Sequence, residues 1–167
     1  MFQIQRGNEM KLLLQKQMFS WFDCYDIYDE NGAPVYQVRG QVAWGHQFRV
    51  YDVSGREVGG IRQVTFSFLP RYEIYLYGTM AGYVSRKFSL LLPKYEIAFK
   101  GWTVKGNPME WNYSVMGNDG QPVAHVSKKI FNLKDTYVME TDNYDNLLPV
   151  LMLVLAIDAE KASRLVS

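Results

Sequence analysis

Leu-Leu-Pro-Val-Leu-Met-Leu-Val-Leu-Ala-Ile, residues 147–157, is the stretch that decides the fold. These eleven residues are all apolar, and as a helix they extend only about 16 Å, roughly half the hydrocarbon thickness of a bilayer. A membrane-spanning helix is therefore not expected. A helix that is apolar on every side must be enclosed on every side, and the sequence before it is typical of short β-strands. We therefore predict a closed sheet wrapped around a C-terminal helix.

The length and charge of the chain indicate one domain without a strongly charged partner. The 167 residues include 18 Lys and Arg against 17 Asp and Glu, so net charge gives no reason to expect nucleic acid. Better patterned sequence begins at Met10, and we expect residues 1–9 to be a flexible extension and residues 10–167 to form a single domain. No secretion signal is recognisable, and the single cysteine, Cys24, cannot form an internal disulfide. We expect a cytoplasmic protein with Cys24 buried or half-buried.

Four stretches share one pattern, in which an alternating aromatic and β-branched run is followed by a turn and a second run. Each is interpreted as a β-hairpin, because dipeptides such as Asn31-Gly32 and Asp119-Gly120 tolerate the positive φ angles of tight turns. The four stretches are 25–39, 48–62, 72–86 and 111–128, a weaker pair is 95–99 with 102–104, and a last strand is 137–141. Together they predict eleven or twelve antiparallel strands.

Alternation along these runs assigns one face of each strand to the interior. A sheet of this many strands exposes two edges unless it closes, and the helix is available to fill the resulting barrel. Gly59-Gly60 is interpreted as a bulge that bends a strand. The residues predicted to face inward are Tyr25, Ile27, Phe48, Val50, Tyr72, Ile74, Leu76, Tyr95, Ile97, Phe99, Trp111, Tyr113 and Val115.

Polar residues mark where the apolar helix begins. Asp142, Asn143 and Asp145 precede it and can accept hydrogen bonds from its first amides, and Asp145 is the predicted N-cap. Pro149 lacks an amide hydrogen, so we expect it in or near the first turn.

Short motifs spaced along the chain resemble those of a known family. They are Asp-Glu-Asn-Gly at 29–32, Gly-Trp at 101–102, Gly-Asn at 106–107, Val-Ser-Lys-Lys at 126–129, Asp-Thr-Tyr at 135–137 and Leu-Ala-Ile-Asp at 155–158. With the apolar helix, their order resembles the LURP-one-related proteins, a branch of the tubby C-terminal-like superfamily that includes phospholipid scramblases. The resemblance covers nearly all of the chain from Met10 and implies a twelve-stranded barrel around a central helix. Tubby domains bind phosphoinositides and scramblases act on bilayers, but a shared fold does not transfer a function.

Basic residues concentrate in the middle of the chain. Residues 71–130 hold eight basic and four acidic residues. Near a membrane each such charge contributes about 1 kcal/mol, so these residues are a candidate site for an anionic headgroup. The alternative is an ordinary solvated barrel exterior. The candidate residues are Arg86, Lys87, Lys94, Lys100, Lys105, Lys128 and Lys129.

No motif for catalysis, a cofactor or a metal stands out. His46 and His125 lack partners at metal-ligand spacing, and Cys24 lacks a nearby base that would activate it. Glu140, Asp142 and Asp145 do not follow the EF-hand spacing, so calcium binding stays open for them while helix capping is favoured.

The sequence favours a non-catalytic module that binds anionic phospholipid headgroups at a membrane surface. The alternative is a soluble domain for protein interaction or scaffolding, indicated by 25 aromatic residues (4 Trp, 12 Tyr and 9 Phe), more than one interior is expected to absorb. An enzyme and a scramblase are less favoured. No nucleophile or acid-base pair is visible, and the helix is too short to cross a bilayer.

Overall fold

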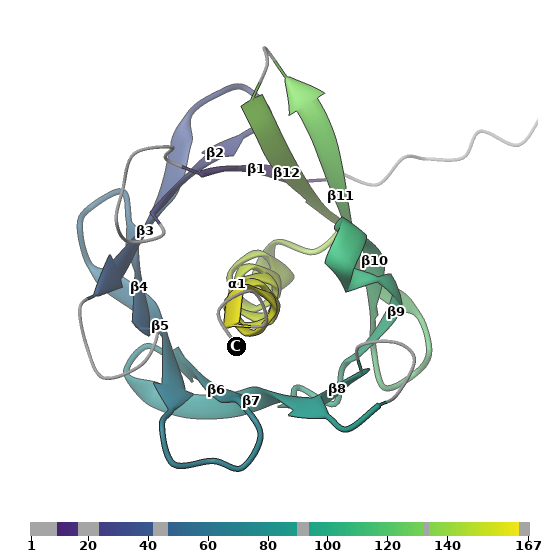
Figure 1. Ribbon diagram of the computed structural model, residues 1–167. Coiled ribbons are helices and arrows are strands. Elements are labelled where there is room, and N and C mark those ends of the chain that lie inside the picture. The colour runs from purple at the N-terminus through teal and green to yellow at the C-terminus, as the bar shows by residue number, and fades with distance from the viewer. Residues whose placement is uncertain (1–9, 17–23, 42–46, 90–93, 132–133, 164–167) are drawn as a thin grey trace, which may run out of the picture.

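The computed structural model describes residues 10–16, 24–41, 47–89, 94–131 and 134–163. The predicted extension, residues 1–9, lies outside them. Twelve antiparallel strands form one sheet in the order β8-β7-β6-β5-β4-β3-β2-β1-β12-β11-β10-β9. The sheet curls into a barrel and the helix α1 lies inside it (Figure 1), which confirms the predicted architecture.

The strands and helices follow one another in this order: β1 Met10–Lys16, β2 Tyr25–Asp29, β3 Pro34–Gln41, β4 Gln47–Asp52, β5 Glu57–Val64, β6 Arg71–Leu76, β7 Thr79–Lys87, β8 Lys94–Phe99, β9 Thr103–Asn107, the 3-10 helix η1 Pro108–Glu110, β10 Asn112–Met116, β11 Pro122–Phe131, β12 Lys134–Thr141, the 3-10 helix η2 Tyr144–Asn146, and α1 Leu147–Ser163.

Strand β1 is the element that the sequence patterns do not predict. It pairs with β2 on one side and with β12 on the other, so it joins the first hairpin to the last strand. Leu12 and Leu14 are almost completely buried, whereas Leu13 between them is only half-buried. The three leucines therefore alternate across the sheet, although their identical chemistry hides the alternation from a reading of the sequence.

The four predicted hairpins are confirmed, and they share one irregularity. In each, the second strand carries one residue more than its partner, which shifts the register. The extra residues are Val35, Val58, Ala81 and Val123. Because such bulges bend a strand and increase its twist, their repetition helps to curve the sheet into a barrel. The bulge predicted at Gly59-Gly60 lies one residue earlier, at Val58.

Helix α1 fills the interior, as predicted. Every one of residues 147–157 is buried. The helix packs mainly against β5, β6 and β7. Gly59 on β5 makes this approach possible, because a Cβ atom there would lie 2.5 Å from the Sδ atom of Met152.

The helix begins differently from the prediction. Asn143, not Asp145, supplies the cap: its Oδ1 accepts a hydrogen bond from the Asp145 amide at 2.9 Å. The reason is that η2 precedes α1, which moves the first unpaired amides toward the N-terminus. Pro149 is the third residue of α1 and therefore lies in the first turn, as expected.

The barrel is nearly closed. Strands β8 and β9 stand at the two ends of the sheet order and are joined by the turn at Lys100 and Gly101. The Trp102 amide donates to the Phe99 carbonyl at 3.0 Å, but no ladder between β8 and β9 is found in the described part of the chain. The weaker hairpin predicted over 95–99 and 102–104 therefore consists of two real strands that do not pair. We call the space between them the seam.

The connections between strands lie at two opposite ends of the barrel, because consecutive strands are antiparallel. The turn end comprises residues 30–33, 53–56, 77–78, 100–101 and 117–121 and the start of α1. The loop end comprises residues 65–70, 88–89 and 108–110 and the C-terminal end of α1, and Figure 1 views the barrel from the loop end.

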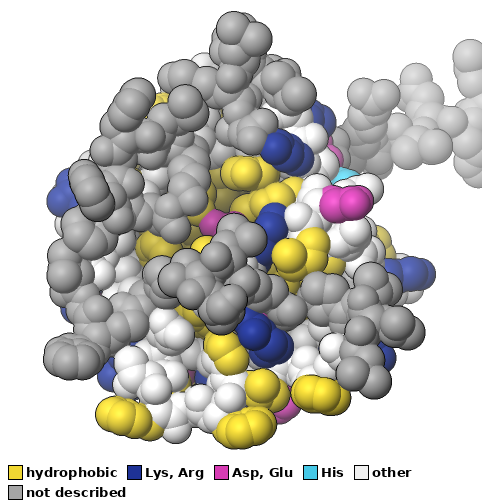
Figure 2. Space-filling model, in the orientation of Figure 1, with side chains coloured by type: hydrophobic (Ala, Val, Ile, Leu, Met, Phe, Trp, Pro, Cys, Tyr) yellow, Lys and Arg dark blue, Asp and Glu magenta, His cyan; other side chains and the backbone are white. Residues whose placement is uncertain are grey.

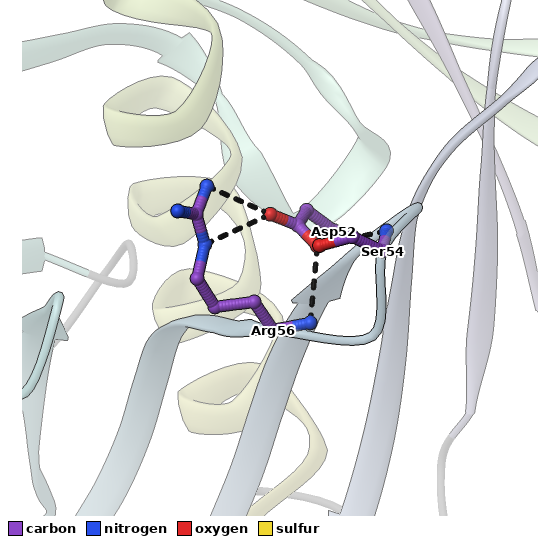
Figure 3. Close-up of polar contacts among 3 residues, drawn as sticks. All are labelled: Asp52, Ser54 and Arg56. Atoms are coloured by element: carbon purple, nitrogen blue, oxygen red, sulfur yellow. Dashed lines mark hydrogen bonds and ion pairs between the residues drawn. The ribbon is translucent and has the colours of Figure 1, made fainter.

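In turns at the turn end, aspartate side chains accept hydrogen bonds from backbone amides of the same turn. Figure 3 shows the turn after β4, where Asp52 Oδ1 accepts from the amides of Ser54 and Arg56 at 2.9 and 3.0 Å. The Ser54 hydroxyl also donates to Asp52, and this bond is the main reason that the pKa of Asp52 lies below its ordinary value. Asp29 accepts in the same way from two amides of the first turn. Such aspartate-centred turns fix the hairpins locally.

Candidate functional site

Three phenylalanines at the loop end have no contact with the core. Phe66 and Phe68 are fully exposed in the connection between β5 and β6, and Phe88, just after β7, is 81% exposed. The two segments lie side by side, because the Arg86 amide donates to the Pro70 carbonyl at 3.1 Å. Single exposed apolar residues are ordinary, whereas several on adjacent loops mark a contact surface. We call these three side chains the Phe rim.

Two of the predicted basic residues lie beside the Phe rim. Lys87 and Lys94 occupy directly opposite positions on β7 and β8, and both are exposed. Like charges directly opposite one another destabilise a sheet, and neither lysine forms an ion pair within the described residues. An anion between or above them would remove this repulsion. In Figure 2, which shows the loop end, hydrophobic side chains stand along the lower margin, where Figure 1 places β6 and β7.

A third predicted residue, Arg86, is committed to the interior. Its Nε donates to Glu160 Oε1 at 2.6 Å, and the Glu160 side chain is completely buried. Arg86 also donates to the Ser163 hydroxyl at 3.3 Å. Because a carboxylate in the interior is costly without a partner, this pair ties the last turns of α1 to the end of β7. Arg86 therefore holds the helix in place.

The other side of the C-terminal part of α1 is fixed by aromatic partners. The Tyr25 hydroxyl donates to Asp158, and the Lys161 ammonium lies 5.1 Å from the centre of the Trp111 ring. Burial lowers the pKa of Lys161, Asp158 opposes this effect, and the nearby charge of Lys128 adds to the lowering. Lys128 therefore lies near the C-terminal end of α1, at the mouth of the barrel.

The remaining predicted residues are spread over the wall. Lys129 lies 3.9 Å from Glu140, which also pairs with Lys11 at 3.0 Å. Lys105 is exposed on β9. Lys100 lies at the turn end, 5.6 Å from the centre of the Trp102 ring. Of the seven residues, the structure thus brings Lys87 and Lys94 together beside the Phe rim and places Lys100 at the opposite end.

The Phe rim is the part of this site that sequence reasoning missed. Its signal is visible in two connections of similar composition, Phe66-Ser-Phe-Leu-Pro70 and Phe88-Ser-Leu-Leu-Leu-Pro93. Each is an apolar run ending in proline at a place between strands where polar turn residues are usual. Apolar residues that neither alternate in a strand nor repeat in a helix are candidates for a contact surface.

Other predicted sites have these positions. His125 is exposed, with its Nδ1 3.2 Å from the Ser114 hydroxyl, and His46 lies outside the described residues. Cys24 is half-buried, as expected. Within the described ranges, no group of three or more potential metal ligands is found. No helix among these residues is both long and apolar enough to cross a membrane.

Comparison with known proteins places the chain in a family. The model of the LURP-one-related family matches residues 10–158. The chain belongs to the LURP-one-related family. This LURP-one-related chain is similar to YxjI, an uncharacterized protein of Bacillus subtilis (strain 168), with 28% identity over 151 residues that cover 89% of this chain and 92% of YxjI. It is also similar in fold to a protein of Arabidopsis thaliana solved by X-ray crystallography, with a TM-score of 0.64, 18% identity and 91% of each chain covered.

Proposed function

We propose that this LURP-one-related barrel is a non-catalytic module that binds anionic phospholipid headgroups at the cytoplasmic surface of a membrane, with its loop end toward the lipid. The observation that carries the proposal is the Phe rim beside Lys87 and Lys94. Apolar side chains that enter the interface, flanked by cations that meet anionic headgroups, form the usual combination of a peripheral anchor.

The strength of such an anchor is modest. Fully burying a phenylalanine side chain contributes about 1.5–3 kcal/mol, and each cation near an anionic surface contributes about 1 kcal/mol. Partial insertion of three side chains with two cations gives on the order of 6 kcal/mol, before the cost of association. Binding is therefore reversible, and α1 stays within the barrel, where residues 147–157 are already buried.

Co-sedimentation with liposomes tests the apolar part of the anchor. The protein should bind vesicles of phosphatidylcholine with about one quarter phosphatidylserine, and the variant Phe66→Ser/Phe68→Ser/Phe88→Ser should lose at least about tenfold in affinity. The matched control is Val53→Ser/Tyr144→Ser, which removes two exposed apolar side chains from the turn end. Equal losses in both variants contradict the proposed orientation.

The contribution of the two lysines is tested by reversing their charge. Lys87→Glu/Lys94→Glu should abolish binding at low salt, where electrostatic attraction is strongest. Lys100→Glu, at the turn end, should leave binding almost unchanged. Absence of binding to anionic vesicles by the wild type at low salt overturns the proposed function.

A further inference from the structure

The seam between β8 and β9 is wider than the spacing between paired strands. Every other neighbouring pair of strands forms a ladder, whereas the Cα atoms of β8 and β9 lie more than 8 Å apart at nearly all positions. Paired strands lie about 4.8 Å apart, so one additional strand between two edges requires about 9.6 Å. Because Trp102 still bonds to Phe99 at the turn, the seam is closed at the turn end and opens toward the loop end.

Both edges of the seam present backbone groups for which the described residues provide no hydrogen-bond partner. The Phe99 carbonyl points toward β9, since it accepts from Trp102. Alternation in an antiparallel strand then directs the N–H and C=O groups of Ile97 into the seam, and the same argument from Trp102 directs those of Val104. No hydrogen bond to these groups is found among the described residues. The edges therefore offer main-chain donors and acceptors from two sides.

A groove of about 420 Å³ lies along the seam. Apolar side chains line part of it: Ile97 and Val104 are half-buried, and Trp102, which is buried, also lines the groove. The inner side is bridged near the loop end, where the Tyr95 hydroxyl lies 3.9 Å from Met109 Sδ. The groove thus has an apolar floor and is open to the outside.

The outer margins of the seam are basic. Lys94 on β8 and Lys105 on β9 are exposed, and neither forms an ion pair with any described residue. Glu96, the acidic residue between them in sequence, is held by the Tyr83 hydroxyl at 2.7 Å on the side of β7. Outward-facing side chains of an inserted strand would therefore meet positive charge.

We infer that the seam is a peptide-binding site, in which an extended segment of a partner protein inserts as a thirteenth strand with apolar side chains alternating with acidic ones. Apolar residues of the segment would lie on Ile97 and Val104, and acidic ones beside Lys94 and Lys105. A second copy of this barrel fits the geometry less well, because edge-to-edge pairing of two barrels uses one edge of each. A single strand satisfies both edges at once, and main-chain bonding gives such strand addition its affinity.

Fluorescence anisotropy with a labelled eight-residue peptide of alternating Val and Glu tests the inference on the full chain. Saturable binding is expected below about 1 mM. Ile97→Pro should weaken it at least about tenfold, because proline removes the N–H that points into the seam but leaves the ladder to β7 intact. Ile97→Val, which retains that N–H and the apolar floor, is the matched control. Lys105→Glu should remove most of the preference for the Val-Glu peptide over a Val-Lys peptide, because Lys94 then stands opposite a carboxylate.

A second peptide tests whether binding depends on main-chain hydrogen bonds. The Val-Glu peptide with N-methyl groups on alternate amides keeps its side chains but cannot form a ladder on both sides, so it should not bind. Equal binding of the methylated peptide, equal binding by Ile97→Pro, or no saturable binding of the unmethylated peptide overturns the inference. Liposome binding by Ile97→Pro should equal that of the wild type, so the peptide site and the membrane anchor succeed or fail separately.

Discussion

The turn end and the loop end of the barrel are built from opposite kinds of sequence. At the turn end, aspartate and glycine close short connections whose polar groups bond to one another, as in the turn of Asp52 and Arg56. At the loop end, connections carry exposed phenylalanines, and the ion pair of Arg86 with Glu160 holds the helix. The comparison indicates that the turn end specifies the register of the strands, whereas the loop end carries a set of exposed phenylalanines that the fold itself does not need; the turn end has exposed apolar side chains as well, Val53 and Tyr144 among them.

The largest effect on stability is expected from the ion pair at the loop end. Arg86→Met removes the guanidinium that pairs with the fully buried Glu160, and we expect the free energy of unfolding to fall by about 3–5 kcal/mol. Urea unfolding followed by tryptophan fluorescence measures the loss. The double variant Arg86→Met/Glu160→Leu should recover most of it, since neither charge then remains. A loss no larger than that of Lys87→Met, its exposed neighbour, contradicts the role given to the pair.

The next effect is a loss of stability at alkaline pH that comes from Tyr36 at the turn end. Burial, followed by the neighbouring Tyr144, Tyr77 and Asp52, raises the pKa of Tyr36 to about 12. The unfolded chain releases this proton first, near pH 10, so the stabilisation is complete below pH 10 and is lost as the pH rises toward 12. A shift of two pKa units corresponds to at most about 2.7 kcal/mol, and partial exposure reduces it.

Unfolding at about pH 9 and about pH 11 measures this alkaline loss. Tyr36→Phe should lose less stability between the two pH values than the wild type does. Tyr77→Phe, which removes one of the smaller causes of the raised pKa at an exposed tyrosine of the same end, should behave more like the wild type than Tyr36→Phe does. The same alkaline loss in Tyr36→Phe and wild type contradicts the assignment.

A smaller effect is expected in the turn of Figure 3. Gly55 has a φ of +79°, and a Cβ atom added there would have no other atom within 4 Å, so Gly55→Ala is unfavourable through backbone conformation alone. We expect a loss of about 1 kcal/mol in the free energy of unfolding. Gly60→Ala is the control, since that backbone does not have a positive φ and the new Cβ meets only ordinary contacts. Similar losses in both variants contradict the importance of the turn conformation.

The smallest effect is expected from the Phe rim. Phe66→Ser/Phe68→Ser/Phe88→Ser removes three exposed side chains. The free energy of unfolding, measured with urea, should therefore change by no more than about 0.5 kcal/mol per substitution. A larger loss shows that these residues belong to the folded core, and it removes the distinction between the two ends.

Local pattern explains which parts of the fold could be predicted. The four hairpins and α1 depend on residues that are neighbours in sequence, so alternation, turn glycines and the apolar run reveal them. Strand β1 could not be predicted from the sequence pattern, because Leu12, Leu13 and Leu14 are chemically alike although only two of them face inward. The seam could not be predicted either, because nothing in the sequences of β8 and β9 indicates that these consecutive strands do not pair.

The candidate site was less predictable, because its relations are between distant residues. Arg86 and Glu160 are 74 positions apart, so no spacing rule separates Arg86 from the exposed Lys87 beside it. Lys87 and Lys94 meet only through the register of β7 and β8. Phe66, Phe68 and Phe88 could have been recognised as apolar residues outside any period, but their closeness depends on the order of strands in the sheet.

The position of α1 in the chain has a consequence for synthesis. All twelve strands precede the helix that fills their interior, so the strands are synthesised before α1. Until α1 emerges, the inward faces of the strands have no apolar partner, and the nascent chain is exposed to aggregation and to chaperones. The barrel is therefore expected to acquire its final packing only after translation of its last seventeen helical residues.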